Sequence, residues 1–384
     1  MNDIRRDLKS FDFLLFFMVI ALGAFGVLMV GSTTGLGSGN VSGMFVNQII
    51  FFATGIVVML VAAFVNYELI AKFYIPIYII NVVLLIIVML IPRQPGEVAR
   101  WLGVRVGGVE LGIQPSELSK ILTLIFLAKV IDKNRDGINH PLIVGLVVLT
   151  TMISSVLIFR QPALSASVVL IFIMAALLYT GKLSYKYIIG VTVIAVPILL
   201  YLFVDMHREP GERVFLDMIP EYQLGRIWYF LYPELDVGFV YTYQNVRAIN
   251  ALNSGMLQGR GLFQNTIFVP ESTNDFIFAI IGAELGFIGS VLTLAAATII
   301  ILRMLIIANR SDVFLGRLIA SGAAAAMAFQ VFTHVGINVW LLPNTGMSFP
   351  FVSSGGSALW VFMAMTGLVL NVGMTRTKSM FDEM

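Results

Sequence analysis

The stretch YQNVRAINALNSGMLQGRGLFQNTIFVPESTNDFIFAIIGAELGFIG, residues 243–289, decides the fold because it joins a polar segment to a long apolar helix. Three carboxylates, Glu271, Asp275 and Glu284, lie at or inside the start of that helix, and Phe-Ile-Phe follows Asp275 directly. A carboxylate there must lie at a membrane–water boundary or in a cavity, where charge is costly, so we interpret Asp275 as functional. The alternative is that Asp275 only favours a helix N-terminus, which suits an anion.

Glycine-containing motifs precede these carboxylates, Ser254-Gly255 and then Gly259-Arg260-Gly261. Glycine has no side chain, so we interpret this run as flexible backbone that can approach another segment closely.

The composition identifies the class of protein. Of the 384 residues, 58% are hydrophobic and 12% are charged, which indicates an integral membrane protein. The chain has no cysteine, which excludes a disulfide framework, and its net charge of +2 argues against a nucleic-acid partner. The first apolar run is too long for a cleavable signal peptide. No metal-ligand spacing, P-loop, dinucleotide fingerprint or Ser/His/Asp order is present.

Ten apolar runs are candidates for membrane-spanning helices, each of which needs about 20 residues. They cover roughly 11–32, 44–65, 70–91, 116–131, 141–159, 162–181, 186–204, 275–307, 314–341 and 356–376. The expected fold is therefore an all-α polytopic membrane domain over 1–384, with a large loop at 205–274 between the seventh and eighth helices. The fourth run is short and carries Glu117 and Lys120, so we expect it to begin within a cavity of the protein.

The distribution of Lys and Arg in short loops predicts the orientation. With the N-terminus inside, the cytoplasmic segments hold Arg5, Arg6, Lys9, Lys72, Lys133, Arg135, Lys182, Lys186, Arg303, Arg310, Arg376 and Lys378. The short outer loops hold only Arg93, Arg100, Arg105 and Arg160. Both termini are therefore expected to be cytoplasmic, and the segments 92–115 and 205–274, together with Asp275, to be extracytoplasmic.

The first outer segment, 93–118, contains glycines and a short alternating pattern that predict a compact turn or hairpin. At the helix start that ends this segment, Glu117 and Lys120 are three residues apart and share one helix face. Two interpretations stay open, a buried structural ion pair and a substrate site. Lys120 could instead meet a negatively charged lipid headgroup.

Within 205–242, mixed charges alternate with aromatic residues, which is typical of an amphipathic element at a membrane interface. Arg226 and, just after this segment, Arg247 are candidates to bind phosphate, because a guanidinium group pairs with phosphate through two hydrogen bonds. A structural role is the alternative for each.

The segment 334–360 cannot form one continuous helix because Pro343, Gly346 and Pro350 interrupt it. Non-helical backbone at membrane depth is tolerated only when it is buried in protein or lines a watery cavity. The amides before the last helix could face an anion, which makes Ser353, Ser354, Gly355 and Gly356 candidates for substrate binding. The alternative is a loop that closes the bundle, and we interpret His334 as a packing residue.

Together these motifs resemble the SEDS family of bacterial cell-wall polymerases, the RodA/FtsW/SpoVE group, and RodA-like members above all. The resemblance spans almost the whole chain in order. Its residues are Arg100-Trp101, Gln114-Pro115-Ser116-Glu117, Lys120, Tyr243-Gln244, Ala248-Ile249, Ser254-Gly255, Gly259-x-Gly261, Pro270-Glu271, Asp275-Phe276-Ile277-Phe278, Glu284-Leu285-Gly286-Phe287-Ile288-Gly289, Pro343-x-Thr345-Gly346 and Pro350-Phe351-x-Ser353-x-Gly355-Gly356-Ser357.

The chain departs from the family pattern at several positions. The sixth helix commonly starts with Gln-Pro-Asp, but here the residues are Gln161-Pro162-Ala163 and the carboxylate is missing. The usual Glu-Glu pair is Ala283-Glu284, the usual Thr before the aspartate is Asn274, and the outer loop before Arg226 is long. These differences leave Asp275 in place.

The resemblance implies a peptidoglycan glycosyltransferase that polymerises lipid II into glycan strands during cell elongation or division. Asp275 would be the general base or a metal-holding carboxylate. Lys120, Arg226 and Arg247 would contact the pyrophosphate, and Glu117 and Glu271 would lie beside the substrate. It also implies a possible divalent cation, Mg²⁺ or Mn²⁺, a class B penicillin-binding protein transpeptidase as partner, and the bacterial cytoplasmic membrane with its lipids as location.

Two other classes of function stay open. Intramembrane charge and broken helices suit a lipid II flippase or transporter equally well, although no inverted repeat is evident. A scaffold that only positions a transpeptidase would not need its own carboxylates.

Overall fold

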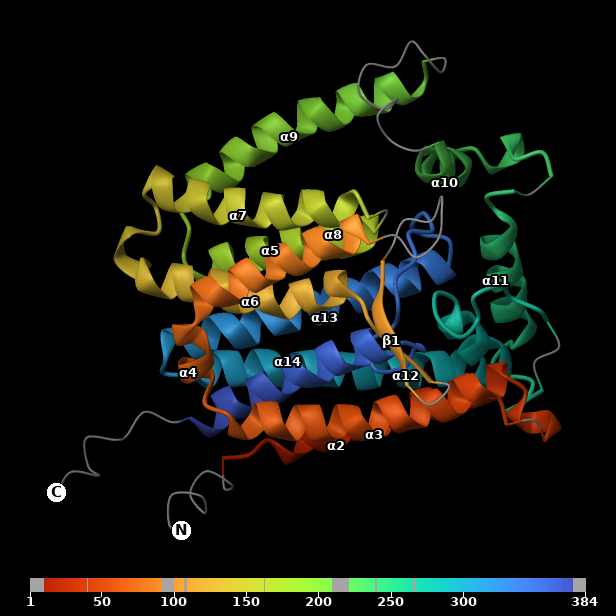
Figure 1. Ribbon diagram of the computed structural model, residues 1–384. Helices are drawn as coiled ribbons and strands as arrows, with labels where there is room; N and C mark the ends of the chain where they lie inside the picture. Colours follow the sequence, from red (N-terminus) through yellow and green to blue (C-terminus); the bar gives the residue numbers. More distant parts are fainter. Residues whose placement is uncertain are drawn as a thin grey trace.

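A computed structural model of the protein describes residues 10–39, 41–91, 100–106, 109–161, 163–208, 221–238, 240–264 and 267–375. Its long helices, apart from α9, run side by side in one bundle (Figure 1). They are α2 (Phe13–Thr33), α3 (Gly43–Phe64), α5 (Tyr74–Leu90), α6 (Pro115–Lys133), α7 (Pro141–Phe159), α8 (Leu164–Thr180), α9 (Tyr185–Met206), α12 (Ile277–Arg310), α13 (Phe314–Asn338) and α14 (Gly356–Met374). The short helices are α4 (Tyr67–Lys72), α10 (Glu221–Leu231) and α11 (Tyr243–Ser254).

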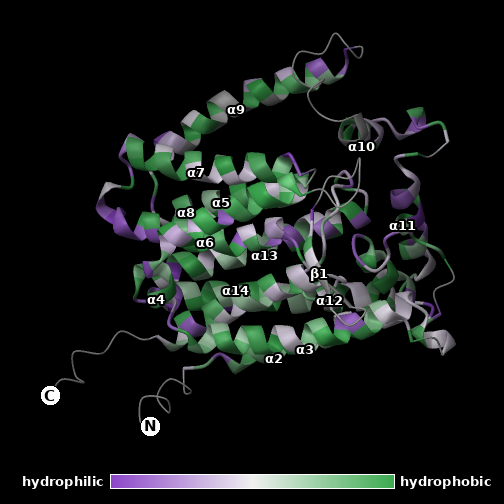
Figure 2. Ribbon diagram, in the orientation of Figure 1, coloured by the Kyte–Doolittle hydropathy of each residue, from purple (hydrophilic) through white to green (hydrophobic). Residues whose placement is uncertain are grey.

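Each of the ten predicted ranges overlaps one of the long helices, and the predicted polytopic α-helical membrane fold is confirmed. Seven of these helices, α2, α3, α7, α9, α12, α13 and α14, are long and apolar enough to cross a membrane. Figure 2 shows hydrophobic residues along the bundle and hydrophilic residues gathered mainly in the connecting segments. The number of membrane spans stays a prediction.

Helix starts follow from local hydrogen bonding. The Asp12 carboxylate accepts a hydrogen bond from the Leu15 amide at the start of α2, and the Ser42 hydroxyl accepts one from the Phe45 amide at the start of α3. Pro115 occupies the first turn of α6, where its missing N–H costs nothing. These caps satisfy amides that helices leave free at their N-termini.

The last helix, α14, lies at the centre of the bundle and packs mainly against α3, with further contacts to α13, α12 and α6. A side chain at Gly367 would meet the Met59 carbonyl of α3 at 2.3 Å, so glycine permits this close packing. Asn371 fixes the other end of the pair, because its side-chain amide donates to the Ala63 carbonyl and accepts from the Tyr67 amide.

The hairpin predicted within residues 93–118 is present. Strands β1 (Leu102–Val106) and β2 (Val109–Ile113) pair antiparallel, with Leu102 opposite Ile113. The Ser357 hydroxyl donates to the Gly112 carbonyl and accepts from the Gln114 amide. The hairpin is thereby attached to the start of α14.

The eighth predicted helix is present as α12, but it bends at Gly286, where φ is 67° and ψ is −163°, and this bend was not predicted from the sequence. The preceding polar segment replaces the lost helical hydrogen bonds. The amides of Arg260 and Gly261 donate to the carbonyls of Ala283 and Glu284, and the amides of Phe287 and Ile288 donate to the carbonyls of Met256 and Leu257. The predicted close approach is confirmed, because a side chain on Gly259 would meet the Glu284 carbonyl at 2.1 Å.

Other boundaries also differ from the prediction. The third range is split at Phe73 into α4 and α5, and the ninth helix ends at Asn338, before the prolines that follow. The segment 205–274, predicted as a large loop, contains α10 and α11, so it is not only a loop. Figure 1 shows α9 diverging from the rest of the bundle toward α10.

Candidate functional site

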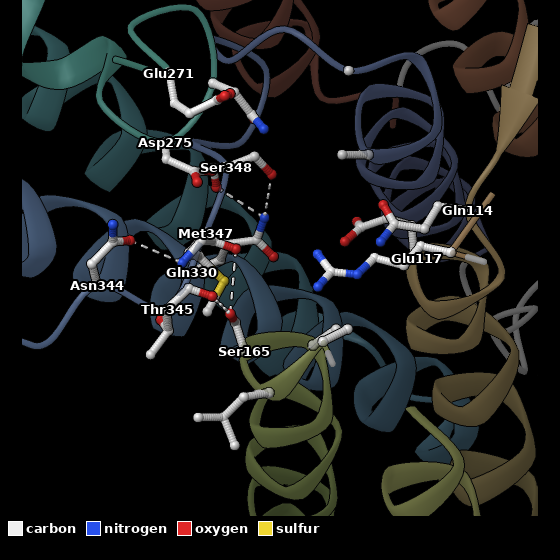
Figure 3. A pocket seen from close by; sticks show the side chains of 18 of the residues that line it. Gln114, Glu117, Ser165, Glu271, Asp275, Gln330, Asn344, Thr345, Met347 and Ser348 are labelled. Carbon is white, nitrogen blue, oxygen red and sulfur yellow. Dashed lines mark hydrogen bonds between the residues drawn. The ribbon is translucent and has the colours of Figure 1, made fainter. Parts of the chain in front are cut away.

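A polar cavity of about 430 Å³ lies where the hairpin, α6, α8 and the start of α12 meet the non-helical segment between α13 and α14. Most of the predicted site residues line it. They are Glu117, Lys120, Arg226, Glu271, Asp275, Ser354 and Gly355. Figure 3 shows Glu271 and Asp275 on one side of the cavity and Gln114 and Glu117 on the other.

Asp275 lies in a turn immediately before α12. The Asn338 side chain of α13 holds this turn, because its amide group donates to the Asp275 carbonyl at 2.9 Å and its oxygen accepts from the Ala279 amide at 3.0 Å. The N-cap residue of α12 is Phe276, and no side chain caps this helix. The Asp275 side chain therefore does not cap α12 by a hydrogen bond, and it lines the cavity.

The electrostatic surroundings of Asp275 favour a weakly acidic carboxyl group. Burial, and then the nearby charge of Glu271, raise the pKa of Asp275 to about 6, while the charges of Arg226 and Arg100 act in the opposite direction. Among the residues that the structure describes, no group donates a hydrogen bond to this carboxylate. A base needs to be ionised and still able to accept a proton, and a pKa near 6 meets both requirements.

Glu271 shares the cavity with Asp275 through a turn and not through a helix. Its φ of 51° is unusual for a residue with a side chain, and its carbonyl accepts from the amides of Asn274 and Phe276. The helix α12 begins only at Ile277, so Glu271 and Asp275 do not share a helix face. Glu271 is exposed, whereas Asp275 is partly buried, so the two carboxylates have different environments.

Glu117 and Lys120 form the predicted ion pair on α6. The Lys120 Nζ donates to Glu117 Oε1 at 2.7 Å and to Oε2 at 2.8 Å, and Lys120 is 1% exposed. It also donates to Gln330 Oε1 at 2.9 Å, and the Gln330 amide group donates to the Ser348 carbonyl and hydroxyl. The pair is thus both structural and part of the cavity wall, so the two interpretations are not exclusive.

Arg226 reaches the cavity from α10. Its Nη1 donates to the Asn344 carbonyl at 3.4 Å, and the Asn344 side chain donates to Gln244 Oε1 at 2.7 Å. The Asn344 oxygen also accepts from the Gly346 amide. These contacts place a guanidinium beside the interrupted segment, in the lining of the cavity.

Three of the predicted substrate-binding residues do not line the cavity. The Arg247 Nε donates to the Phe268 carbonyl at 2.7 Å and supports the loop before Asp275. The Ser353 hydroxyl donates to the Asn274 carbonyl and accepts from the Phe349 amide. Gly356 packs against the Phe51 ring. Their contacts indicate structural roles.

The predicted anion site on the amides before α14 is also not supported for residues 353–355. The Ser353 amide donates to the Phe349 carbonyl, the Ser354 amide to the Thr273 carbonyl, and the Gly355 amide to Gln48 Oε1. These bonds close the interrupted segment over the turn that carries Asp275. The alternative interpretation, a loop that closes the bundle, describes this part better.

The cavity also contains polar residues that were not assigned to the site from the sequence, Arg100, Gln114, Ser165, Gln330 and Asn344. Arg100 and Gln114 belong to the motifs Arg100-Trp101 and Gln114-Pro115-Ser116-Glu117, so the resemblance to the family could have assigned them to the site. Gln330 and Ser165 lie inside apolar helices, where a lone polar side chain is the only signal. Ala163, which replaces the family's carboxylate, lines the same cavity.

The carboxylates of the cavity could hold a divalent metal ion only in part. Asp275 and Glu271 offer two carboxylates to the cavity, and among the described residues no group of three or more His, Cys, Asp or Glu side chains could hold a metal ion. Mg²⁺ in enzymes that act on phosphates usually binds one or two carboxylates plus the phosphates of the substrate. The residues present fit such an ion only if the substrate provides part of its coordination.

The family model described as "Cell cycle protein", which covers FtsW, RodA and SpoVE, matches residues 12–378. The chain belongs to this family. The chain is 31% identical to a protein named probable peptidoglycan glycosyltransferase FtsW from Trichlorobacter lovleyi, over 95% of this chain and 93% of the relative. It is also 31% identical to the peptidoglycan glycosyltransferase MrdB of Escherichia coli K12, over 95% and 94% of the two chains. These two relatives, one named FtsW and the other MrdB, thus have the same sequence identity to this chain.

Solved structures show the same fold. One, reported as "Structural coordination of polymerization and crosslinking by a peptidoglycan synthase complex", has a TM-score of 0.77 at 23% identity and covers 94% of this chain and 97% of its own. The RodA crystal structure from Thermus thermophilus has a TM-score of 0.65 at 23% identity, with coverage of 94% and 96%. The predictions of the family and of an enzyme with glycosyltransferase function are confirmed, and the flippase alternative is not favoured.

Proposed function

We propose that this family member polymerises lipid II into glycan strands, with Asp275 as the general base. The observation that carries the proposal is the Asp275 carboxylate, raised in pKa and free of hydrogen bonds from described residues, in a cavity lined by Lys120, Arg226 and Arg100. A base beside several cations suits a reaction in which a hydroxyl attacks and a pyrophosphate leaves. The relatives named peptidoglycan glycosyltransferases support the same substrate class.

In the proposed reaction, the acceptor sugar hydroxyl attacks the anomeric carbon of the donor. Asp275 takes the hydroxyl proton as the new glycosidic bond forms, and the bond from the anomeric carbon to the lipid pyrophosphate breaks. Arg226 stabilises the charge that develops on the departing pyrophosphate, because guanidinium donors match phosphate oxygens. Lys120 donates hydrogen bonds to Glu117 and Gln330. It therefore adds positive charge to the cavity lining and fixes the positions of these two side chains, without contacting the pyrophosphate directly.

The second role proposed for Asp275, in place of the base, is that of a metal-holding carboxylate: a divalent cation, Mg²⁺ or Mn²⁺, would then be held by Asp275 and Glu271 together with the substrate's pyrophosphate. Bound there, it would neutralise charge on the leaving group. Glu271 is more exposed than Asp275 and is suited to this secondary role.

We propose that the cavity opens on the extracytoplasmic side, that both termini are cytoplasmic, and that the membrane is the bacterial cytoplasmic membrane. The support is the bias of Lys and Arg toward the opposite loops. A class B penicillin-binding protein transpeptidase is the proposed partner, and the fold shared with a peptidoglycan synthase complex supports it.

The test is glycan-chain formation by purified protein with lipid II in detergent. Asp275→Asn keeps the shape and removes the charge, so polymerisation is expected to fall by about 10²-fold or more, the usual scale for a general base. Lipid II binding and thermal stability should persist. Glu271→Gln is the matched control, since it neutralises the other carboxylate of the cavity and is expected to have a milder effect.

Scrambling of lipid II in vesicles, assayed with the same variants, separates the enzyme from a transporter. Asp275→Asn is expected to leave scrambling unchanged. Normal polymerisation by this variant would refute the base assignment, and loss of scrambling alone would support the flippase instead.

A further inference from the structure

A second cavity, of about 800 Å³, lies where α8 turns into α9, beside the end of α12 and the start of α13. Figure 1 shows this turn at the end of the bundle that carries α4, away from α10 and α11. None of the residues that line it belongs to the candidate active site. It is therefore a separate feature of the molecule.

Three cations line this second cavity, Lys182 in the turn, Lys186 at the start of α9, and Arg317 on α13. No carboxylate is among its lining residues. Within the described part of the chain, none of the three cations forms an ion pair with a carboxylate. The cavity thus carries uncompensated positive charge, which favours an anionic ligand.

Arg317 has unused hydrogen-bonding capacity. Its Nη2 donates to the Ser311 carbonyl at 3.1 Å, but its buried Nε has no hydrogen-bond partner. Buried donors normally have partners. Guanidinium donors pair with phosphate oxygens, so a phosphate group is the anion that this arrangement suits.

The wall beside these cations is apolar and exposed. Tyr179 is 68% exposed, Tyr185 69%, Ile189 61% and Leu305 44%. Tyrosines are enriched where a membrane protein meets the headgroup region. A free phosphate ion would gain nothing from such a wall, whereas a lipid would bury its acyl chain against it.

We propose that this cavity binds the phosphate headgroup of an anionic glycerophospholipid, with Lys182, Lys186 and Arg317 around the phosphate and the acyl chains along Ile189 and Leu305. Basic pockets between transmembrane helices on the cytoplasmic side are suited to anionic headgroups. The proposed orientation places this cavity on that side. The site does not depend on the proposed glycosyltransferase function.

The test is fluorescence anisotropy of a dye-labelled short-chain phosphatidylglycerol, titrated with the full-length protein in a non-ionic detergent. Lys182→Gln/Lys186→Gln is expected to weaken binding by about tenfold or more, because each cation near an anionic lipid contributes attraction. Both lysines are exposed, so the variant should fold normally. Lys72→Gln/Lys133→Gln removes two exposed charges at the same end, outside the cavity, and should bind like the unmodified protein.

Competition identifies the ligand. Unlabelled phosphatidylglycerol should displace the probe, while phosphatidylcholine and inorganic phosphate at equal concentration should not. If the two double variants lost affinity for the lipid equally, the proposal would be overturned, since binding would then depend only on the net charge of the protein. Displacement by inorganic phosphate as effective as displacement by lipid would overturn the lipid assignment, and displacement by phosphatidylcholine would exclude recognition of the anionic headgroup.

Discussion

The Lys120 ammonium group is bonded to both oxygens of Glu117, at 2.7 and 2.8 Å, while 99% of the lysine surface is buried. Gln330 accepts a third hydrogen bond from the same nitrogen. The ammonium group therefore uses all three of its donors inside the protein. This arrangement connects α6 with α13 directly beneath the candidate active site.

Removing one partner of this pair is expected to be destabilising. Lys120→Met leaves the Glu117 charge uncompensated, at a cost of about 3–5 kcal/mol. The double variant Glu117→Gln/Lys120→Met should recover much of the stability without recovering activity. Thermal unfolding in detergent and glycan formation measure the two effects, and normal values of both in Lys120→Met would contradict a role for the pair.

The rate of polymerisation is expected to rise with pH through about 6 and then level off. Burial and Glu271 raise the pKa of Asp275 to about 6, so below that value the carboxyl group is protonated and cannot act as a base. Glu271→Gln removes one of the two raising influences and should shift the midpoint to lower pH. A single-turnover pH profile checks this, and an unchanged midpoint in Glu271→Gln would argue that another group titrates.

Asp275→Asn is expected to be more stable than the unmodified protein at pH 8. The folded pKa lies above the unfolded value of 3.8, so the carboxyl group favours the folded state below pH 3.8, and this contribution is lost as pH rises through 6. The shift corresponds to at most about 3 kcal/mol. Unfolding temperatures of the two proteins should converge as the pH falls to 3.8 and below, and a difference that does not depend on pH would contradict the assignment.

Gly346→Ala is expected to lower polymerisation activity because the new methyl group would crowd the Asp275 carboxylate. Gly346 has a φ of 68°, and an added Cβ would lie 3.3 Å from the Asp275 Oδ2. The matched control is Gly39→Ala, which carries similar backbone strain at a φ of 81° but has no atom within 4 Å of the new carbon. Both variants should lose about 1–2 kcal/mol of stability. Only Gly346→Ala should lose polymerisation by about tenfold, measured as kcat with lipid II.

The proposed orientation can be tested with one cysteine. The chain has no cysteine of its own, and Ser272 lies in the turn between Glu271 and Asp275. Ser272→Cys should react with a membrane-impermeant thiol reagent in intact protoplasts. Labelling that requires permeabilised cells would place Asp275 on the cytoplasmic side and remove the case for extracytoplasmic chemistry.

Much of the bundle could be predicted because spanning helices need long apolar runs. Cavity-lining residues could be predicted where a charged residue interrupts an apolar run, as Asp275 and Lys120 do. The prediction failed where geometry depends on tertiary contacts. Nothing local shows that the Arg247 guanidinium turns to the Phe268 carbonyl or that Ser353 bonds to Asn274. The bend at Gly286 was missed because the hydrogen bonds that permit it come from a different segment.

That bend determines which pieces of the chain can be exchanged. Residues 256–261 supply the hydrogen-bonding partners that the backbone of residues 283–288 lacks. A chimaera that takes one of these segments from a distant relative and keeps the other would leave amides and carbonyls unmatched. The two segments therefore behave as a single inherited module, and a boundary for recombination belongs before α11 or after the bend, not between them.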